Sequence, residues 1–316
     1  MRQAQDLKIV FMGTPEFAVV SLQKLLDHQI PVVGVVTGPD KPSGRGLQVQ
    51  PTPVKKLALH AGLPILQPDK LREPQFTQSL REWQADLFLV VAFRILPPEV
   101  FMLPPLGTIN VHAALLPKYR GAAPIQWAII NGERETGVTT FFIDAKMDTG
   151  EMILQRQTAI GDFETAGELH DRMAVLGADL LVETLGQVAS GKLQTRQQMG
   201  EASLAPKITK EMAAIAWKKS SREIFNLVRG MNPAPGAFTH WQGHQLKIFR
   251  AHVVDAAAAA SEAGSVVNVN AKEGEFFIQT GRGHLAIDEL QIEGKRRMSA
   301  AEFLRGHVIQ IHEKLN

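Results

Sequence analysis

The chain has 316 residues, of which 45% are hydrophobic and 21% are charged, and its formal net charge is only +2. These values are those of an ordinary globular protein, and the length suggests roughly two domains. Because there is no cysteine, disulfides, thiolate nucleophiles and zinc–thiolate sites are excluded. The first residues lack the apolar core of a signal peptide, and no apolar run approaches the roughly 18 residues of a membrane helix. We therefore expect a cytoplasmic protein without a membrane partner.

The first two thirds of the chain alternate between strand and helix patterns. Strands are predicted at residues 7–12, 32–37, 64–67, 87–93, 108–112 and 138–143, and helices at 54–60, 75–83, 125–131 and 165–188. A further helix is predicted after Gly13, with Thr14 as its cap and Pro15 at its first position. This alternation is typical of an open, mostly parallel α/β sheet.

The pattern changes after residue 189. Residues 190–206 are polar and are interpreted as a linker, and a helix with an apolar face is predicted at 221–231. Short strand patterns follow at 237–241, 245–251, 264–268, 276–279 and 285–292. About five short strands suggest a small barrel of the oligonucleotide-binding (OB-like) kind. We therefore expect an α/β domain at 1–189, a linker at 190–206 and a barrel-like domain at 207–316.

Charge is distributed unevenly between these parts. Residues 1–205 carry 19 Lys and Arg against 21 Asp and Glu, whereas residues 206–316 carry 15 against 11. The mildly basic C-terminal part is compatible with a polyanionic partner, although an ordinary solvated surface explains the same excess.

Three polar residues in or beside apolar segments form a candidate catalytic site. Asn110 and His112 alternate along one predicted strand, so both side chains should face the same side of the sheet. Asp148 follows the next buried strand. Polar groups at the carboxyl ends of parallel strands converge on the crevice where open α/β sheets bind ligands. An amide there can stabilise negative charge, an imidazole can carry a proton, and a carboxylate can orient the imidazole or hold a water.

Each of these residues also has a simpler explanation when it is taken alone. A strand-end asparagine is commonly a turn residue, a lone histidine is commonly a satisfied surface or core group, and Asp148-Thr149-Gly150 is a turn sequence. Spacing alone does not decide between a catalytic and a structural interpretation, so the choice depends on the flanking residues.

Several motifs flank the three residues. They are Asn110-Val111-His112 followed by Leu115-Leu116-Pro117, then Arg120-Gly121-Ala122-Ala123-Pro124, residues 136–139 and Met147-Asp148-Thr149-Gly150. This set closely resembles the formyltransferase family that uses 10-formyltetrahydrofolate. Residues 13–17, 39–46 and 205–208 are similar to the members that formylate methionyl-tRNA, and the resemblance spans nearly the whole chain. It implies a Rossmann-like catalytic domain with a C-terminal barrel, in which Asn110, His112 and Asp148 are the catalytic residues.

The resemblance also implies the substrates, 10-formyltetrahydrofolate as co-substrate and initiator methionyl-tRNA as acceptor. No metal is needed, and we expect a monomer. The implied folate-binding residues form two segments, Ala92, Phe93, Arg94 and Leu96, and Ala114, Leu115, Leu116 and Pro117. The chain departs from the family twice. Ala114 replaces the usual serine before Leu-Leu-Pro, and Phe93-Arg94 replaces a Tyr-Gly pair in a segment about one residue shorter.

Two basic segments are candidate tRNA contacts. The loop 38–53 contains three Gly and four Pro around Lys41 and Arg45, which is typical of a mobile loop, too polar to pack, that closes over a substrate. A second cluster contains Lys207, Lys210, Lys218, Lys219 and Arg222. Such charges supply salt-sensitive affinity rather than base reading, and a solvated surface is the alternative for both segments. We interpret the nearby Trp217 as a core residue rather than a base-stacking platform.

Two other functions are weighed against this interpretation. A formyltransferase that acts on a small amine, such as a nucleotide sugar, would share Asn110, His112 and Asp148, but the basic loop and the C-terminal domain argue against it. A non-catalytic RNA-binding protein that has kept the fold would have no need of the three residues.

Overall fold

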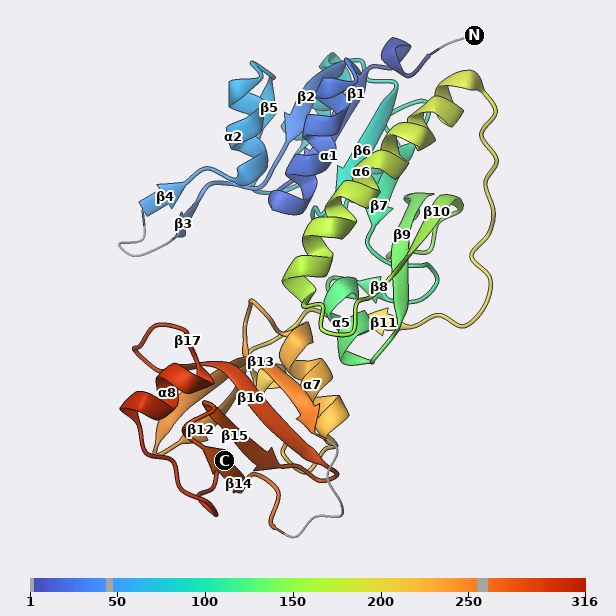
Figure 1. Ribbon diagram of the computed structural model, residues 1–316. Helices are drawn as coiled ribbons and strands as arrows, with labels where there is room; N and C mark the ends of the chain where they lie inside the picture. Colours follow the sequence, from blue (N-terminus) through green and yellow to red (C-terminus); the bar gives the residue numbers. More distant parts are fainter. Residues whose placement is uncertain (1–2, 44–47, 255–260) are drawn as a thin grey trace. The chain divides into compact units, whose positions relative to one another are not determined.

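The computed structural model describes residues 3–43, 48–254 and 261–316. The chain forms two compact units (Figure 1). Unit 1 contains Met1–Pro124, Thr136–Ala159 and His170–Pro206, and unit 2 contains Ile125–Glu135, Ile160–Leu169 and Lys207–Asn316. Unit 2 therefore includes two short segments from the sequence that lies between strands of unit 1.

Unit 1 is built on a seven-stranded sheet with the strand order β10-β9-β7-β6-β1-β2-β5. Its strands are β1 (Ile9–Gly13), β2 (Val32–Val36), β5 (Ile65–Leu66), β6 (Leu87–Val91), β7 (Thr108–His112), β9 (Glu135–Phe142) and β10 (Met152–Ala159). The five strands from β7 to β5 pair in parallel, whereas β9 pairs with β7 antiparallel. The predicted open, mostly parallel α/β sheet is confirmed. Strand β10 was not predicted.

Helices connect the strands of unit 1 and cover its sheet (Figure 1). They are η1 (Ala4–Asp6), α1 (Glu16–Asp27), α2 (Pro53–His60), α3 (Pro74–Glu82), α4 (Pro98–Phe101) and α6 (Ala166–Ser190). The predicted cap of α1 is wrong, because Pro15 is the cap residue and no side chain caps the helix. The Thr14 hydroxyl instead accepts a hydrogen bond from the Gly38 amide at 3.2 Å, so it joins the turn after β1 to the end of the next strand.

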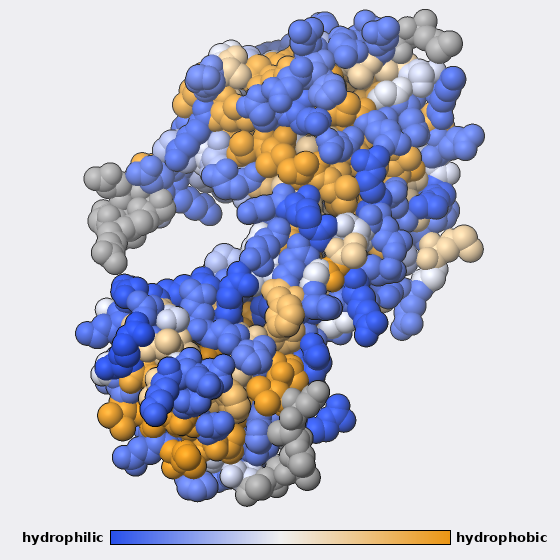
Figure 2. Space-filling view, in the orientation of Figure 1, coloured by the Kyte–Doolittle hydropathy of each residue, from blue (hydrophilic) through white to orange (hydrophobic). Residues whose placement is uncertain are grey.

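Among the described residues, α6 alone is long and apolar enough to cross a membrane by length and composition, which corrects the expectation that no segment approaches that limit. Its packing nevertheless accounts for its apolar residues. A Cβ on Gly177 would lie 3.1 Å from the Val111 side chain on β7, and the Thr184 hydroxyl lies 2.9 Å from that of Thr140 on β9. Leu181 and Leu185 of α6 are fully buried, although Figure 2 shows that hydrophobic residues also reach the surface on the side of unit 1 where α1 and α6 lie. We interpret α6 as a helix that packs on the sheet.

Unit 2 contains an antiparallel sheet with the strand order β12-β13-β16-β15-β14. Its elements are α5 (Pro124–Ile130), η2 (Glu211–Ala213), α7 (Ser221–Gly230), β12 (Ala237–Trp241), β13 (His244–Val254), β14 (Val266–Asn270), β15 (Glu275–Gln279), β16 (His284–Ile292), β17 (Met298–Ser299) and α8 (Ala300–Gly306). The last residues close the sheet, because Asn316 exchanges two backbone hydrogen bonds with His240 on β12 and the Leu315 amide donates to Gly264 just before β14. The predicted small barrel is confirmed.

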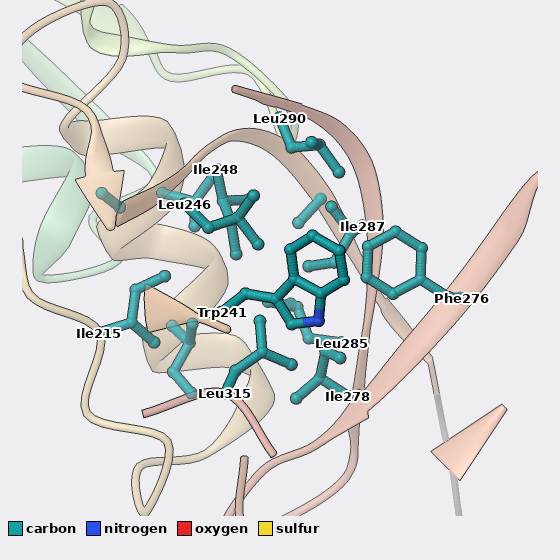
Figure 3. Close-up of a cluster of buried hydrophobic side chains, with 14 of the residues drawn as sticks. Ile215, Trp241, Leu246, Ile248, Phe276, Ile278, Leu285, Ile287, Leu290 and Leu315 are labelled. Carbon is teal, nitrogen blue, oxygen red and sulfur yellow. The ribbon is translucent and has the colours of Figure 1, made fainter. Parts of the chain in front are cut away.

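The core of unit 2 lies inside this barrel (Figure 3). The ring of Trp241 meets that of Phe303 edge to face, with centroids 5.2 Å apart. Apolar side chains of β13, β15 and β16 lie around Trp241. Trp217 belongs to the same core, since it is 6% exposed and its indole N–H donates to the Thr239 hydroxyl at 3.0 Å. The interpretation of Trp217 as a core residue is confirmed.

Candidate active site

Asn110 and His112 lie on β7, in the middle of the sheet of unit 1. Asn110 pairs with Val90 of β6, and His112 pairs with Thr139 of β9. Because successive side chains of a strand alternate, the two project from the same face. His112 is 6% exposed, and Asn110 is half-buried. The strand therefore presents an amide and an imidazole side by side on one face.

His112 lies between two acceptor groups. Its Nε2 is 2.8 Å from the backbone carbonyl oxygen of Tyr119. Since a carbonyl only accepts, Nε2 must carry a proton, and Nδ1 is the nitrogen left to exchange one. Nδ1 is 3.8 Å from Oδ2 of Asp148. This separation exceeds a direct hydrogen bond, so a proton passes between them only after a small movement or through a bridging water.

Asp148 is held in the turn between β9 and β10. Its φ of 55° lies in the left-handed region, which non-glycine residues rarely adopt. Its Oδ2 accepts a hydrogen bond of 2.9 Å from the Gly121 amide. Gly121 has a φ of 128°, and a Cβ there would lie 2.5 Å from the Ala205 oxygen, whereas one on Gly150 would lie 1.7 Å from the Phe142 oxygen. Both motif glycines are therefore needed for the chain to bring Asp148 to this position.

The loop that follows β7 is fixed by side chains of β9 and β10. The buried Thr139 hydroxyl donates to the Ala114 oxygen at 2.7 Å and accepts from the Leu116 amide at 3.2 Å. The amide of Gln155 donates to the Leu116 oxygen at 2.8 Å. Ala114 has no exposed surface and Leu116 is 3% exposed, whereas Leu115 and Pro117 are half-buried. Within 114–117, a ligand can therefore reach side-chain surface mainly at Leu115 and Pro117.

The loop that follows β6 lies where the strand order reverses, because β1 has β2 on one side and β6 on the other. Open α/β sheets bind ligands in the crevice at this point. Ala92 is exposed with a φ of 48°, Phe93 and Arg94 are half-buried, and Leu96 is 5% exposed within the core.

Arg94 gives this loop a shape that a Gly at the same position would not. Its guanidinium donates to the Asp69 oxygen at 3.0 Å and to the Pro68 oxygen at 2.7 Å, and it lies over the Phe93 ring, 5.2 Å from the centroid. Burial lowers the pKa of Arg94, and the charge of Asp69 opposes that shift. The arginine therefore ties the loop after β6 to the segment after β5, while Ala92 remains exposed.

The described parts of the loop 38–53, residues 38–43 and 48–53, contain more regular structure than the sequence predicted. Lys41 lies on β3 (Lys41–Ser43), which pairs antiparallel with β4 (Gln48–Gln50). At the base of the loop, Asp40 accepts hydrogen bonds from Lys55 at 2.5 Å and Gln67 at 2.7 Å, and these bonds lower the pKa of Asp40. The expectation that the loop is too polar to pack is wrong at its base, where part-buried hydrogen bonds hold Asp40, whereas Lys41 and Val49 on β3 and β4 are exposed. Arg45 lies outside the described residues.

The second basic cluster lies on unit 2. Lys207, Lys210 and Lys218 are exposed, as are Lys219 and Arg222. Lys207 and Lys210 precede η2, and Lys218 precedes α7, so the cluster extends from the start of the segment 207–316 to α7. These residues belong to a different unit from Asn110, His112 and Asp148.

The sequence did not reveal two groups that contact the site residues, the Tyr119 carbonyl and the Thr139 hydroxyl. Tyr119 acts through its carbonyl oxygen, which no side-chain pattern reveals, whereas Thr139 lies within the motif 136–139 but was not assigned a role. Within the described residues, no three His, Asp or Glu side chains are grouped so that they could hold a metal ion. The site thus consists of an amide, an imidazole with a fixed tautomer and a carboxylate.

Comparison with known proteins decides the family. A sequence model described as formyl transferase matches residues 7–185, and one described as formyl transferase, C-terminal domain, matches residues 207–308. The chain belongs to the formyltransferase family. A methionyl-tRNA formyltransferase of Pelotomaculum thermopropionicum is 50% identical over 95% of this chain and 96% of its own length. One of Acetivibrio thermocellus is 46% identical over 96% and 97%, respectively.

Solved structures agree with the family on the fold. An N-formyltransferase from Helicobacter canadensis, in complex with folinic acid and dTDP-3-aminofucose, has a TM-score of 0.65 and 22% identity, and the alignment covers 89% of this chain and 98% of that one. HypX from Aquifex aeolicus in complex with tetrahydrofolic acid has a TM-score of 0.64 and 18% identity, over 94% of this chain and 47% of that one. At these identities the likeness concerns the fold alone.

Proposed function

We propose that this chain transfers the formyl group of 10-formyltetrahydrofolate to the α-amino group of methionine on initiator methionyl-tRNA. Relatives named methionyl-tRNA formyltransferase match nearly the whole chain at 46–50% identity. The observation that carries the chemistry is the placement of His112 between the Tyr119 carbonyl and Asp148, on the same strand face as Asn110. A small-amine acceptor, such as a nucleotide sugar, is favoured only by distant structural neighbours.

The residues of the site fit the two needs of formyl transfer. When the amine attacks, negative charge develops on the formyl oxygen, and the Asn110 amide is a donor that can stabilise it. The attacking nitrogen must lose a proton, and the departing nitrogen must gain one. His112 can accept and release this proton at Nδ1, because the Tyr119 carbonyl holds the other ring nitrogen protonated. Asp148, opposite Nδ1, stabilises the imidazolium or holds a bridging water.

The two loops at the crevice are the proposed folate contacts. Ala92, Phe93 and Arg94 follow β6 and retain exposed or half-exposed surface, as do Leu115 and Pro117 after β7. Ala114, Leu116 and Leu96 belong to the same proposal, but they are buried and act by shaping the loops. The co-substrate supplies the formyl group, and the protein supplies its orientation and the charge around it.

The tRNA contacts and the assignment of domains complete the proposal. We assign catalysis to the domain 1–189 and tRNA binding to the domain 207–316, with residues 190–206 as the linker between them. We propose that the protein is a monomer that acts in the cytoplasm. Lys41, Arg45, Lys207, Lys210 and Lys218 are the proposed contacts with the tRNA backbone. Lysine and arginine side chains suit this role because phosphate contacts supply affinity that does not depend on sequence.

The decisive test is formylation of charged initiator methionyl-tRNA by the purified protein with 10-formyltetrahydrofolate, with elongator methionyl-tRNA and a dTDP-amino sugar assayed alongside. We expect fast transfer to the initiator tRNA and slow or no transfer to the other two. Transfer to the amino sugar alone would replace the proposal with the small-amine reaction. Folate binding without transfer to any acceptor would leave a binding protein that has kept the fold.

The basic cluster on unit 2 makes a separate prediction about salt. Replacing Lys207, Lys210 and Lys218 together by alanine should weaken tRNA binding and reduce the slope of log affinity against log salt by roughly 0.7–0.9 for each lost phosphate contact. The rate at saturating tRNA should remain unchanged, because none of the three contributes a reacting group. Fluorescence titrations at several salt concentrations measure the slope. A variant with Lys272 and Lys295, also exposed on unit 2, replaced by alanine is the control. Equal slopes for all three proteins would remove the cluster from the tRNA interface.

A further inference from the structure

The segment 195–205, which the sequence identified as part of a linker, runs along the active-site loops of unit 1. At one end, Arg196 exchanges two backbone hydrogen bonds of 2.8 and 2.9 Å with Met152 at the start of β10. At the other end, β11 (Leu204–Ala205) pairs in parallel with β8 (Arg120–Gly121), and Figure 1 shows the two short strands side by side. The segment is therefore fixed on both sides of the turn that carries Asp148.

Between these two anchors, the side chain of Gln198 turns inward. Gln198 is half-buried, whereas Gln197 and Met199 are exposed. Its oxygen accepts two hydrogen bonds from the Arg120 guanidinium, at 3.1 and 2.7 Å. Its nitrogen donates to the backbone oxygens of Asp148 and Gly150, both at 2.9 Å. Both N–H donors of the amide and both acceptor positions are used, so the orientation of this amide is unambiguous.

These bonds act on a residue whose backbone conformation needs support. Asp148 has a left-handed backbone, which a non-glycine residue keeps only where its surroundings impose it. Gln198 holds the backbone on both sides of Thr149, and it thereby fixes where the Asp148 carboxylate lies relative to Nδ1 of His112. The carboxylate also depends on the Gly121 amide, which directly follows Arg120, the partner of Gln198.

The same segment supports the other partner of His112. The Ser203 hydroxyl accepts a hydrogen bond of 2.9 Å from the Tyr119 amide, and the Ser203 carbonyl accepts one of 2.9 Å from the Arg120 amide. The Tyr119 carbonyl is the group that lies against Nε2 of His112. One short stretch of chain therefore supports the acceptors on both ring nitrogens.

We propose that Gln198 is a positioning residue for formyl transfer, which acts through the Asp148 turn on the protonation of His112, and that Ser203 supports the Tyr119 carbonyl in the same way. This inference rests on the proposed function, because it gives the segment a part in that reaction. A contact that served folding alone would also pair the two carbonyls of this turn, so the test must include a readout that loss of folding would not change.

The test replaces Gln198 with methionine, which has a similar length and makes no comparable hydrogen bond. We expect kcat to fall by about 10²-fold, the loss typical of a misplacement of about 1 Å at a reacting group. The KM values for both substrates should change less than twofold. The matched control is Gln197→Met, because Gln197 is an exposed neighbour whose side chain bonds to that of Glu151 and not to the Asp148 turn. In Gln198→Glu the acceptor for Arg120 remains and the two donors are lost, so we expect a rate no higher than that of the methionine variant.

Two further readouts separate positioning from a general loss of structure. In an Asp148→Asn background, measured in single turnovers, Gln198→Met should cost nothing more, because its effect passes through that carboxylate. Hydrogen exchange at the Gly121 amide should become faster in Gln198→Met, while amides of β6 keep their protection. Additive losses in the double variant, or a Gln198→Met enzyme with normal kcat and a protected Gly121, would overturn the inference. Failure of the wild-type protein to formylate methionyl-tRNA would instead refute the proposed function, and the exchange of Gly121 would still report on the role of Gln198.

Discussion

Asp148→Asn should lower the rate of formyl transfer by about 10²–10⁴-fold, the range typical for loss of a group engaged in proton transfer. The asparagine is nearly isosteric, and its oxygen can still accept the hydrogen bond from the Gly121 amide. What disappears is the negative charge opposite Nδ1 of His112, which in the proposed mechanism stabilises the imidazolium when that nitrogen takes a proton. The defect should therefore appear in kcat.

His112→Ala should cause a loss of the same order, because it removes the group that we propose carries the proton. Both variants are measured in single turnovers at saturating folate, with tRNA affinity and thermal stability determined in parallel. Affinity for initiator methionyl-tRNA should stay near the wild-type value. If affinity for tRNA and thermal stability fell along with activity, Asp148 and His112 would have a structural role rather than a catalytic one.

The sequence could predict the parts of the site that consist of polar side chains at the ends of strands. Asn110 and His112 are two positions apart on an apolar strand, and that spacing alone places them on one face. Asp148 follows the neighbouring strand of the sheet, so the topology brings its turn to the same region. The barrel was predictable for a related reason, since short alternating runs separated by glycine turns have few other solutions.

The parts that were missed depend on backbone groups or on polar residues. The Tyr119 carbonyl has no signature in a sequence, because every residue carries one. The segment 190–206 is polar, and composition cannot distinguish polar side chains in water from those bonded to a neighbouring backbone, as Gln198 is. Strand β10 was missed for the same reason. It is an edge strand, and polar side chains at residues 155–158, in its second half, conceal the strand pattern.

Two local errors have one cause, which is a hydrogen bond to a partner distant in sequence. Thr14 was predicted to cap α1, but its hydroxyl is engaged by the Gly38 amide from the following loop. That loop was predicted to be too polar to pack, yet Asp40 at its base is bonded to both Lys55 and Gln67. In each case a partner distant in sequence supplied the contact, and a pattern that considers only near neighbours cannot include it.

Asn110→Ala should reduce kcat by about 10²–10³-fold, the usual cost of removing one donor to an oxygen that becomes negative in the transition state. Asn110→Asp should be at least as slow, because a carboxylate at this position repels the developing charge instead of stabilising it. The KM for 10-formyltetrahydrofolate should change little in either variant if the hydrogen bond forms mainly in the transition state.

The comparison of kcat with KM decides the role of Asn110. A variant that raised KM for the folate and kept kcat would show that the amide binds the ground state equally well, and stabilisation of the formyl oxygen would then have to come from elsewhere. Of the groups described here, His112 would be the next candidate, because a proton on its Nδ1 would make that nitrogen a donor on the same face of β7. The Asn110→Ala, His112→Ala double variant separates the two cases, since losses that add would indicate independent roles and losses that do not would indicate a shared one.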